Sequence, residues 1–251
     1  SYVARELGFS EISENSMDAV SDRDFVIDYL SAASICMMHI SRFSEELILW
    51  TTEEFSLIKL PAEYTTGSSI MPQKRNPDFA EISRGKTGRV YGNLISMLTI
   101  LKGLPMTYNR DLQEDKEGFF DSHDTLAAVL EVFVGMLPGI QVNSEKARQA
   151  AEGGMVLATD LADYLVIKGV PFREAHGIIS GLSDYASTNH KLFSEISLEE
   201  YRGFSMLFDE DVYEVSVESS ISARNTVGGT SFKMVQQAIK LGYQKLEKQD
   251  A

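Results

Sequence analysis

A short polar stretch at residues 65 to 78, TTGSSIMPQKRNPD, brings together the side chains of this sequence that are best suited to chemistry. Gly67 favours a tight bend that would bring backbone N–H groups close to a ligand. Ser68 and Ser69 add two hydroxyls, and Lys74 adds a positive charge in an otherwise acidic chain. Hydroxyls, a cation and backbone donors together suit a carboxylate or phosphate ligand and any negative charge that develops on it.

The same stretch leads into a predicted helix. Asn76, Pro77 and Asp78 have the residue types of an N-cap, a first helical position and an acid in the first turn. The loop is therefore expected to end at the positive pole of a helix, where anions bind. On residue types alone, a Gly-Ser-Ser loop before a helix is more often only a loop, so a purely structural role is the alternative.

Long helices are predicted on both sides of this loop. No proline or glycine occurs from Phe25 to Leu57, and apolar residues recur there at alternating spacings of four and three. This seam consists of Val26, Leu30, Ala33, Met37, Ile40 and Leu47, with Ser44 as a polar interruption. A seam of this length requires partner helices.

A second helix begins at Pro77, and its predicted apolar side is formed by Ile82, Val90, Leu94, Met97 and Leu101. Its glycines, which suggest a close helix contact or a bend, are Gly85, Gly88 and Gly92. Residues 108 to 122, YNRDLQEDKEGFFDS, are polar and show no apolar period. A third helix after them carries Leu126, Val129, Leu130, Phe133 and Leu137.

Shorter helices separated by turns are predicted after Asn143. They include a break at Gly153-Gly154, a capping box at residues 197–200 and a final helix from about Ser231. The segment VYEVSVESS, at residues 212–220, alternates like a strand. We therefore predict an all-α fold, with a long-helix part at residues 1–148 and a small C-terminal helical domain at residues 149–251.

The composition excludes several function classes. With 37 acidic and 23 basic residues the net charge is −14, and no Lys/Arg-rich face is present to neutralise nucleic-acid phosphates. No apolar run approaches the roughly 20 residues that a membrane-spanning helix needs. The single cysteine, Cys36, cannot form an internal disulfide, which is typical of a reducing compartment. The sequence thus predicts a soluble, cytoplasmic protein that binds neither nucleic acid nor a membrane.

The string GSSIMPQKRNP resembles the signature GSSxMPxKxNP of the fumarase/aspartase superfamily at every fixed position. The matching residues are Gly67, Ser68, Ser69, Met71, Pro72, Lys74, Asn76 and Pro77. Such a long match is far more specific than a lone glycine pattern. The resemblance implies a bundle of long helices, of which this chain holds the C-terminal part, and an elimination that releases fumarate from a succinyl group.

Three further stretches resemble the argininosuccinate lyase family in particular. They are NSMDAVSDRDF at residues 15–25, YNRDLQEDKE at 108–117 and TDLADYLVIKGVPFREAH at 159–176. The resemblance covers essentially the whole chain and implies cleavage of argininosuccinate to arginine and fumarate, a step of arginine biosynthesis. Because the opening residues lack an initiating Met and resemble mid-helix sequence, we expect the chain to begin partway through a longer protein.

The resemblance also assigns roles at the signature loop. Ser68 matches the general base, and cations and loop N–H groups would have to stabilise its ionised form, since a serine hydroxyl is a poor base at neutral pH. Lys74 and Asn76 match positions that contact the substrate carboxylate, and Ser69 would add a loop hydrogen bond. Glu81 matches the glutamate that orients a proton-carrying histidine located upstream of this chain.

Other positions match substrate contacts of the family: Arg23, Tyr108, Gln113 and Lys116. From residue types alone, these would be assigned to a solvated charge cluster and a solvated loop. The four histidines match no family motif and are assigned to packing or surface: His39, His123, His176 and His190.

The resemblance implies a homotetramer whose sites are shared between subunits, and no metal or organic cofactor. The sequence shows no Cys/His ligand cluster and no dinucleotide fingerprint. We expect the 251-residue chain to be inactive alone, because the acid-side histidine lies outside it. Two alternatives are another fumarate-releasing lyase, such as adenylosuccinate lyase or aspartase, and a crystallin-like structural protein of the same fold.

Overall fold

The computed structural model describes residues 2–152 and 155–249. Contacts divide the chain into two compact units, Ser1–Ser144 and Glu145–Ala251, and each is described here by itself. The described residues are mostly helical, with two small two-stranded sheets, which confirms the all-α prediction. The break expected at Gly153-Gly154 lies outside the described residues.

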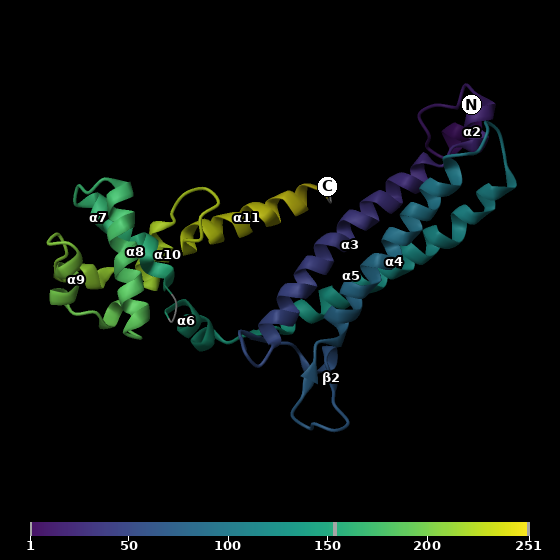
Figure 1. Cartoon of the computed structure of the whole chain (residues 1–251). Coiled ribbons are helices and arrows are strands. Elements are labelled where there is room, and N and C mark those ends of the chain that lie inside the picture. The colour runs from purple at the N-terminus through teal and green to yellow at the C-terminus, as the bar shows by residue number, and fades with distance from the viewer. Residues whose placement is uncertain (1, 153–154, 250–251) are drawn as a thin grey trace. The chain divides into compact units, whose positions relative to one another are not determined.

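The first unit is built on three long helices that lie side by side (Figure 1), namely α3 (Asp24–Thr51), α4 (Asp78–Leu101) and α5 (Asp115–Met136). The shorter helical elements are α1 (Tyr2–Glu6), α2 (Ser16–Ser21), η1 (Ala62–Tyr64), η2 (Arg110–Glu114) and η3 (Leu137–Gly139). The strands are β1 (Ile58–Lys59), β2 (Thr66–Gly67), β3 (Arg75–Asn76) and β4 (Gln141–Val142). Strand β1 pairs with β4, and β2 pairs with β3, both antiparallel.

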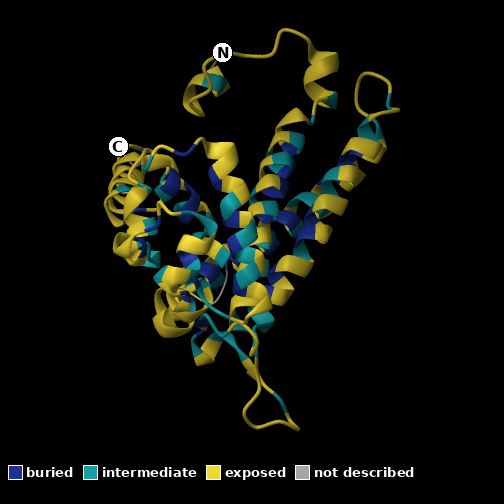
Figure 2. Cartoon of the chain, turned by 60° about the vertical axis from the view of Figure 1, so that its left-hand side comes forward, coloured by how far each residue is buried: buried dark blue, intermediate teal, exposed yellow. Residues whose placement is uncertain are grey.

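The predicted seam of α3 is buried. The buried residues of this helix are Val26, Leu30, Ala33, Ser34, Met37, Ser44 and Leu47, while Ile40 is half-buried. Figure 2 shows such buried residues along the long helices, with exposed residues on their other sides. The four-and-three spacing therefore identified the face on which the three helices pack.

Parts of the patterns predicted for α4 and α5 were wrong. Ile82 is 56% exposed and Leu130 is 42% exposed, whereas the buried positions include the polar residues Ser83, Thr87, Ser122 and Thr125. A Cβ added at Gly85, Gly88 or Gly92 would meet nothing within 4 Å, so these glycines make no close contact among the described residues. The segment 108–122, expected to lack a helical period, forms η2 and the first turns of α5.

The signature loop is the tip of a β-hairpin below the labelled strand β2 in Figure 1. Thr66 lies opposite Asn76, and Gly67 lies opposite Arg75. Asn76 is therefore a strand residue rather than the predicted N-cap, and α4 begins at Asp78 after Pro77. Gly67 has no positive φ, so the hairpin does not use the conformational freedom expected of it.

The second unit is a cluster of shorter helices: α6 (Ser144–Glu152), η4 (Met155–Leu157), α7 (Ala158–Ile167), α8 (Phe172–Thr188), η5 (Phe193–Glu195), α9 (Leu198–Phe204), η6 (Glu210–Glu214), α10 (Val217–Ala223) and α11 (Phe232–Gln249). Its core includes Leu161, Leu165, Leu182, Tyr201 and Phe208. The capping box at Ser197 and Glu200 is confirmed. Residues 212–220 form no strand, but Val215 and Ser216 make a short extended piece between η6 and α10, where Ser216 caps α10 through a reciprocal pair with Ser219.

Candidate functional site

Ser68 stands at the start of the hairpin tip with its side chain turned into the loop. Its Oγ atom accepts hydrogen bonds from the backbone N–H groups of Ile70, at 3.2 Å, and Met71, at 3.1 Å. Hydrogen bonds that a hydroxyl oxygen accepts stabilise its ionised form and so favour loss of its proton. The loop thus supplies the backbone donors that a serine base requires.

Lys74 and Ser69 lie on the same tip and are exposed. The backbone N–H of Lys74 donates to the Met71 carbonyl at 3.0 Å, which closes a turn within the tip. Within residues 2–152 and 155–249, the Lys74 ammonium group takes part in no ion pair. This cation is therefore available to an anionic ligand.

Asn76 and Glu81 occupy the hairpin exit and the first turns of α4. Asn76 is half-buried in β3, and Glu81 is exposed. The Thr66 hydroxyl donates to the carboxylate of Asp78, which ties the entry strand to the first residue of α4. The positive pole of α4 therefore lies directly behind the hairpin.

Arg23 and Lys116 meet at one buried carboxylate. The Asp115 side chain, 8% exposed, accepts from Arg23 Nε at 2.5 Å and from Lys116 Nζ at 2.7 Å. Burial alone would raise the pKa of Asp115, but the hydrogen bonds from Lys116 and Arg23 outweigh it and lower this pKa. A hollow of about 490 Å³, lined in part by Asn93, Glu114 and Asp115, lies beside the cluster.

Tyr108 and Gln113 interact with each other in the same region, since Gln113 Nε2 donates to the Tyr108 hydroxyl. Tyr108 is 47% exposed. The residue before it, Thr107, has a φ of 79°, which is strained for a β-branched residue. Such strain is typical of functional loops, where the surrounding structure holds it in place.

The predicted site residues fall into two groups at opposite ends of the first unit. Arg23 and Lys116 are near the apolar cluster of Leu30 and Met97, which includes the C-terminal end of α4. The hairpin precedes the N-terminal end of α4, and a helix of 24 residues is about 36 Å long. One copy of the chain therefore does not bring the two groups into one site.

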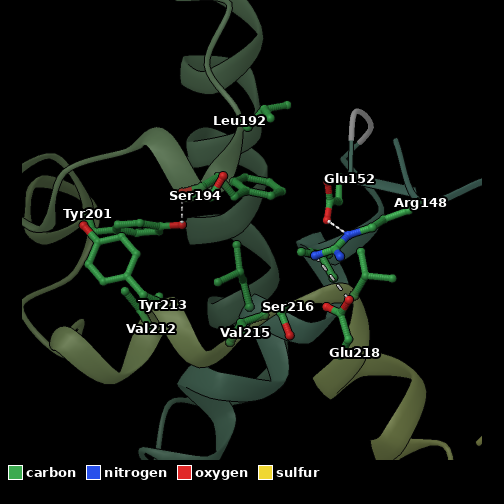
Figure 3. Close-up of a pocket in the computed structure, with 14 residues that line it drawn as sticks. Arg148, Glu152, Leu192, Ser194, Tyr201, Val212, Tyr213, Val215, Ser216 and Glu218 are labelled. Carbon is green, nitrogen blue, oxygen red and sulfur yellow. Dashed lines mark hydrogen bonds and ion pairs between the residues drawn. The ribbon is translucent and has the colours of Figure 1, made fainter. Parts of the chain in front are cut away.

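A cavity of about 340 Å³ in the second unit is shown in Figure 3. Arg148 at its rim pairs with Glu152 at 2.7 Å and with Glu218 at 3.4 Å. The Tyr201 hydroxyl donates to the Phe193 carbonyl at 2.9 Å. These polar groups satisfy one another, and no predicted site residue lines the cavity, so we do not assign the site to it.

One of the four histidines assigned to packing or surface makes a contact between helices. His123 Nδ1 lies 3.0 Å from the Tyr29 hydroxyl, a contact between α3 and α5. Among the described residues, no group of three or more His, Cys, Asp and Glu side chains is arranged to hold a metal ion.

Two family models match this chain. One is described as "Lyase" and matches residues 1–92, and the other is described as "Argininosuccinate lyase C-terminal" and matches residues 155–222. Curated relatives include argininosuccinate lyases of Dehalococcoides mccartyi, 58% identical over 94% of this chain, and Syntrophus aciditrophicus, 55% identical over 95%. The chain belongs to the argininosuccinate lyase family. It spans about half the length of these relatives, 51% in both cases.

Solved structures show the same fold as this family member. An EDDS lyase variant with bound fumarate is 26% identical, with a TM-score of 0.86 over 96% of this chain and 50% of that one. A class II fumarase from Schistosoma mansoni is 19% identical, with a TM-score of 0.69 over 86% of this chain and 46% of that one, which supports the fold alone. Both agree with a fumarase/aspartase-type helical bundle.

Sequence reasoning missed Asp115, the carboxylate that holds Arg23 and Lys116. A signal for it exists in the sequence, because Asp115, Ser122, Val129 and Met136 recur every seven residues and all four are buried. A charged residue on a buried helix face requires a partner. Its partners are Arg23, which lies 92 residues away in the sequence, and Lys116, which is the next residue.

Proposed function

We propose that this chain forms part of the active site of an enzyme that cleaves L-argininosuccinate to L-arginine and fumarate. The observation that carries the proposal is Ser68, whose Oγ atom accepts two backbone N–H groups at the tip of the signature hairpin. A structural relative, a variant of EDDS lyase, holds bound fumarate, which is one product of the proposed elimination. The name of the chain's relatives, argininosuccinate lyase, indicates arginine as the second product.

In the proposed reaction, ionised Ser68 removes the proton next to a succinyl carboxylate. The carbanion places a second negative charge on that carboxylate, which must be stabilised in the transition state. Lys74 contributes the unpaired cation, Asn76 contributes an amide donor, and the N-terminal pole of α4 adds a favourable field. The carbon–nitrogen bond to the guanidinium group then breaks, the departing nitrogen takes a proton from the acid-side histidine, and fumarate and arginine leave. Glu81 orients the acid-side histidine of the complete enzyme.

The other end of the bundle binds the rest of the substrate. Tyr108, Gln113, Arg23 and Lys116 supply a phenol, an amide and two cations, which suit a ligand with several carboxylates. Because this end lies about 36 Å from the hairpin along α4, a second copy must contribute it. A homotetramer with shared sites follows as part of the proposal.

We place this enzyme in the cytoplasm, where a single unpaired cysteine is usual. No helix in the described ranges combines the length and apolar character needed to cross a bilayer. No organic cofactor is part of the proposal.

A substrate panel tests the reaction. The chain is joined behind the N-terminal half of the Dehalococcoides mccartyi relative, which gives a hybrid of the relatives' length. We expect arginine release from argininosuccinate, and no release of AMP, ammonia or water from adenylosuccinate, aspartate or malate. Turnover of one of those substrates in place of argininosuccinate would establish another lyase, and no turnover of any substrate would favour a structural protein.

Ser68→Ala in the hybrid tests the assignment of the base. Loss of the hydroxyl should lower kcat by at least about 1000-fold, or about 4 kcal/mol of barrier. Ser187→Ala, an exposed serine of α8, is the matched control and should leave kcat unchanged. A loss of less than tenfold at Ser68 would show that another group removes the proton.

A further inference from the structure

Residues 61–64, called here the stem of the signature hairpin, pack against two glycines of the first unit. These residues precede β2, and two of them, Tyr64 and Pro61, lie against the end of α5 and the adjoining turn η3. A Cβ added at Gly135 would collide with the Tyr64 hydroxyl oxygen and lie 3.0 Å from its Cζ atom. A Cβ added at Gly139 would lie 2.5 Å from Cγ of Pro61. Gly135 and Gly139, called here the glycine notch, therefore admit the stem only because they lack side chains.

Tyr64 also contacts the element that follows the hairpin. Its ring meets the ring of Phe79 edge-on, with 5.7 Å between centroids. Phe79 is in the first turn of α4, directly after the exit strand β3. Tyr64 is half-buried against the core cluster that contains Val90 and Phe133. One side chain thus connects α5, α4 and the entry strand.

The segment before the stem is fixed to the same region. In the β1–β4 ladder, Ile58 lies opposite Val142. The backbone N–H of Asn143 donates to the Leu57 carbonyl at 2.8 Å. By contrast, Ile70 at the hairpin tip is 86% exposed. The stem is therefore anchored at its base, while the tip that carries Ser68 depends on that base for its position.

We propose that Tyr64, seated in the glycine notch, is a positioning residue that sets where the hairpin presents the Ser68 hydroxyl to the substrate. The inference rests on the proposed function of Ser68 and goes beyond it, because Tyr64 touches no reacting atom. Tyr64 acts through β2, which begins two residues after it. A base displaced by about 1 Å from its proton can lose up to about 100-fold in rate.

Two substitutions in the hybrid enzyme test this role: one adds a methyl group at Gly135, and the other removes the hydroxyl of Tyr64. Gly135→Ala places a methyl group against the Tyr64 hydroxyl, and we expect kcat to fall at least tenfold with KM within threefold, because base placement acts in the transition state. Adding Tyr64→Phe removes the colliding oxygen, and the double variant should recover to within threefold of Tyr64→Phe alone. Gly177→Ala in α8, where a Cβ meets nothing within 4 Å, is the matched control with unchanged kcat.

Recovery in the double variant shows that the loss runs through the contact between Gly135 and Tyr64. The variants are assayed at equal amounts of folded protein, measured by circular dichroism, so that unfolding does not account for the loss. A Gly135→Ala variant with kcat within threefold of the unmodified hybrid would overturn the inference. So would a double variant that stays as impaired as Gly135→Ala.

If the unmodified hybrid cleaves no argininosuccinate, the proposed function fails, and hairpin order then decides the positioning role separately. Backbone amide exchange over residues 66–76 is measured in the 251-residue chain. We expect faster exchange in Gly135→Ala and recovery in the double variant. Equal exchange in all three proteins would overturn the inference.

Discussion

At one end of the long-helix unit the candidate cations are held by a buried carboxylate, whereas at the other end Lys74 is exposed on a hairpin. Arg23 is 15% exposed and is fixed by the buried carboxylate of Asp115. Lys74 is exposed, and among the described residues the Ser68 hydroxyl is bound by two amides of its own loop. The partnered end is thus held by contacts within the chain, whereas in the proposed reaction the substrate supplies the partners of the hairpin end.

The largest effect that follows from this difference concerns Lys74. Lys74→Ala in the hybrid should lower kcat/KM at least about 100-fold, or about 2.7 kcal/mol, since it removes the cation that stabilises the developing charge. Its melting temperature should not change, because the ammonium group has no partner in the described part of the chain. Lys59→Ala, an exposed cation of β1, is the matched control. A matching loss of stability in Lys74→Ala would remove the contrast between the two ends.

Asp115→Asn should affect stability as well as activity. It keeps the size of the side chain but leaves Arg23 and Lys116 without their carboxylate, which should lower the free energy of unfolding by about 1–3 kcal/mol. Urea denaturation of the 251-residue chain measures this directly. If stability changes by less than about 0.5 kcal/mol, the partnered end is not held by this cluster.

The smallest effect is expected in the second unit, which contains none of the candidate site residues. Hydrogen bonds from Lys191, Tyr185 and Ser197 lower the pKa of Glu200 from 4.5 to about 2. Because its folded pKa is depressed, Glu200 contributes stability that is complete above about pH 4.5 and is lost as the pH falls towards 2. Glu200→Gln should flatten the acid dependence of unfolding in that window. An unchanged acid profile would count against these hydrogen bonds.

The same two ends show how much the sequence could predict. The α3 seam was predictable because apolar residues fill most of its buried positions. The start of α5 was not, since its buried positions hold Asp115 and Ser122, and a polar buried face leaves no apolar period. Leu130 was misplaced for the opposite reason, because an apolar residue on an exposed helix face is not distinguished by spacing from one on the core face.

At the candidate site, residue identities were predicted but their arrangement was not. The motif named Ser68 and Lys74 together because they are neighbours in the sequence. The hairpin itself was missed, since the two-residue strands β2 and β3 are too short to alternate. The contact between Tyr64 and Gly135 was also missed, because it joins residues far apart in the sequence and no local pattern reveals it.

The most direct test of the account mixes two inactive hybrids. Ser68→Ala damages the hairpin end, and Lys116→Ala damages the partnered end. If each site takes its hairpin from one copy and its substrate-binding cations from another, subunits mixed by mild denaturation and renaturation should recover activity at roughly a quarter of their sites. A mixture that stays as inactive as either variant alone would contradict the assembly of one site from opposite ends of two chains.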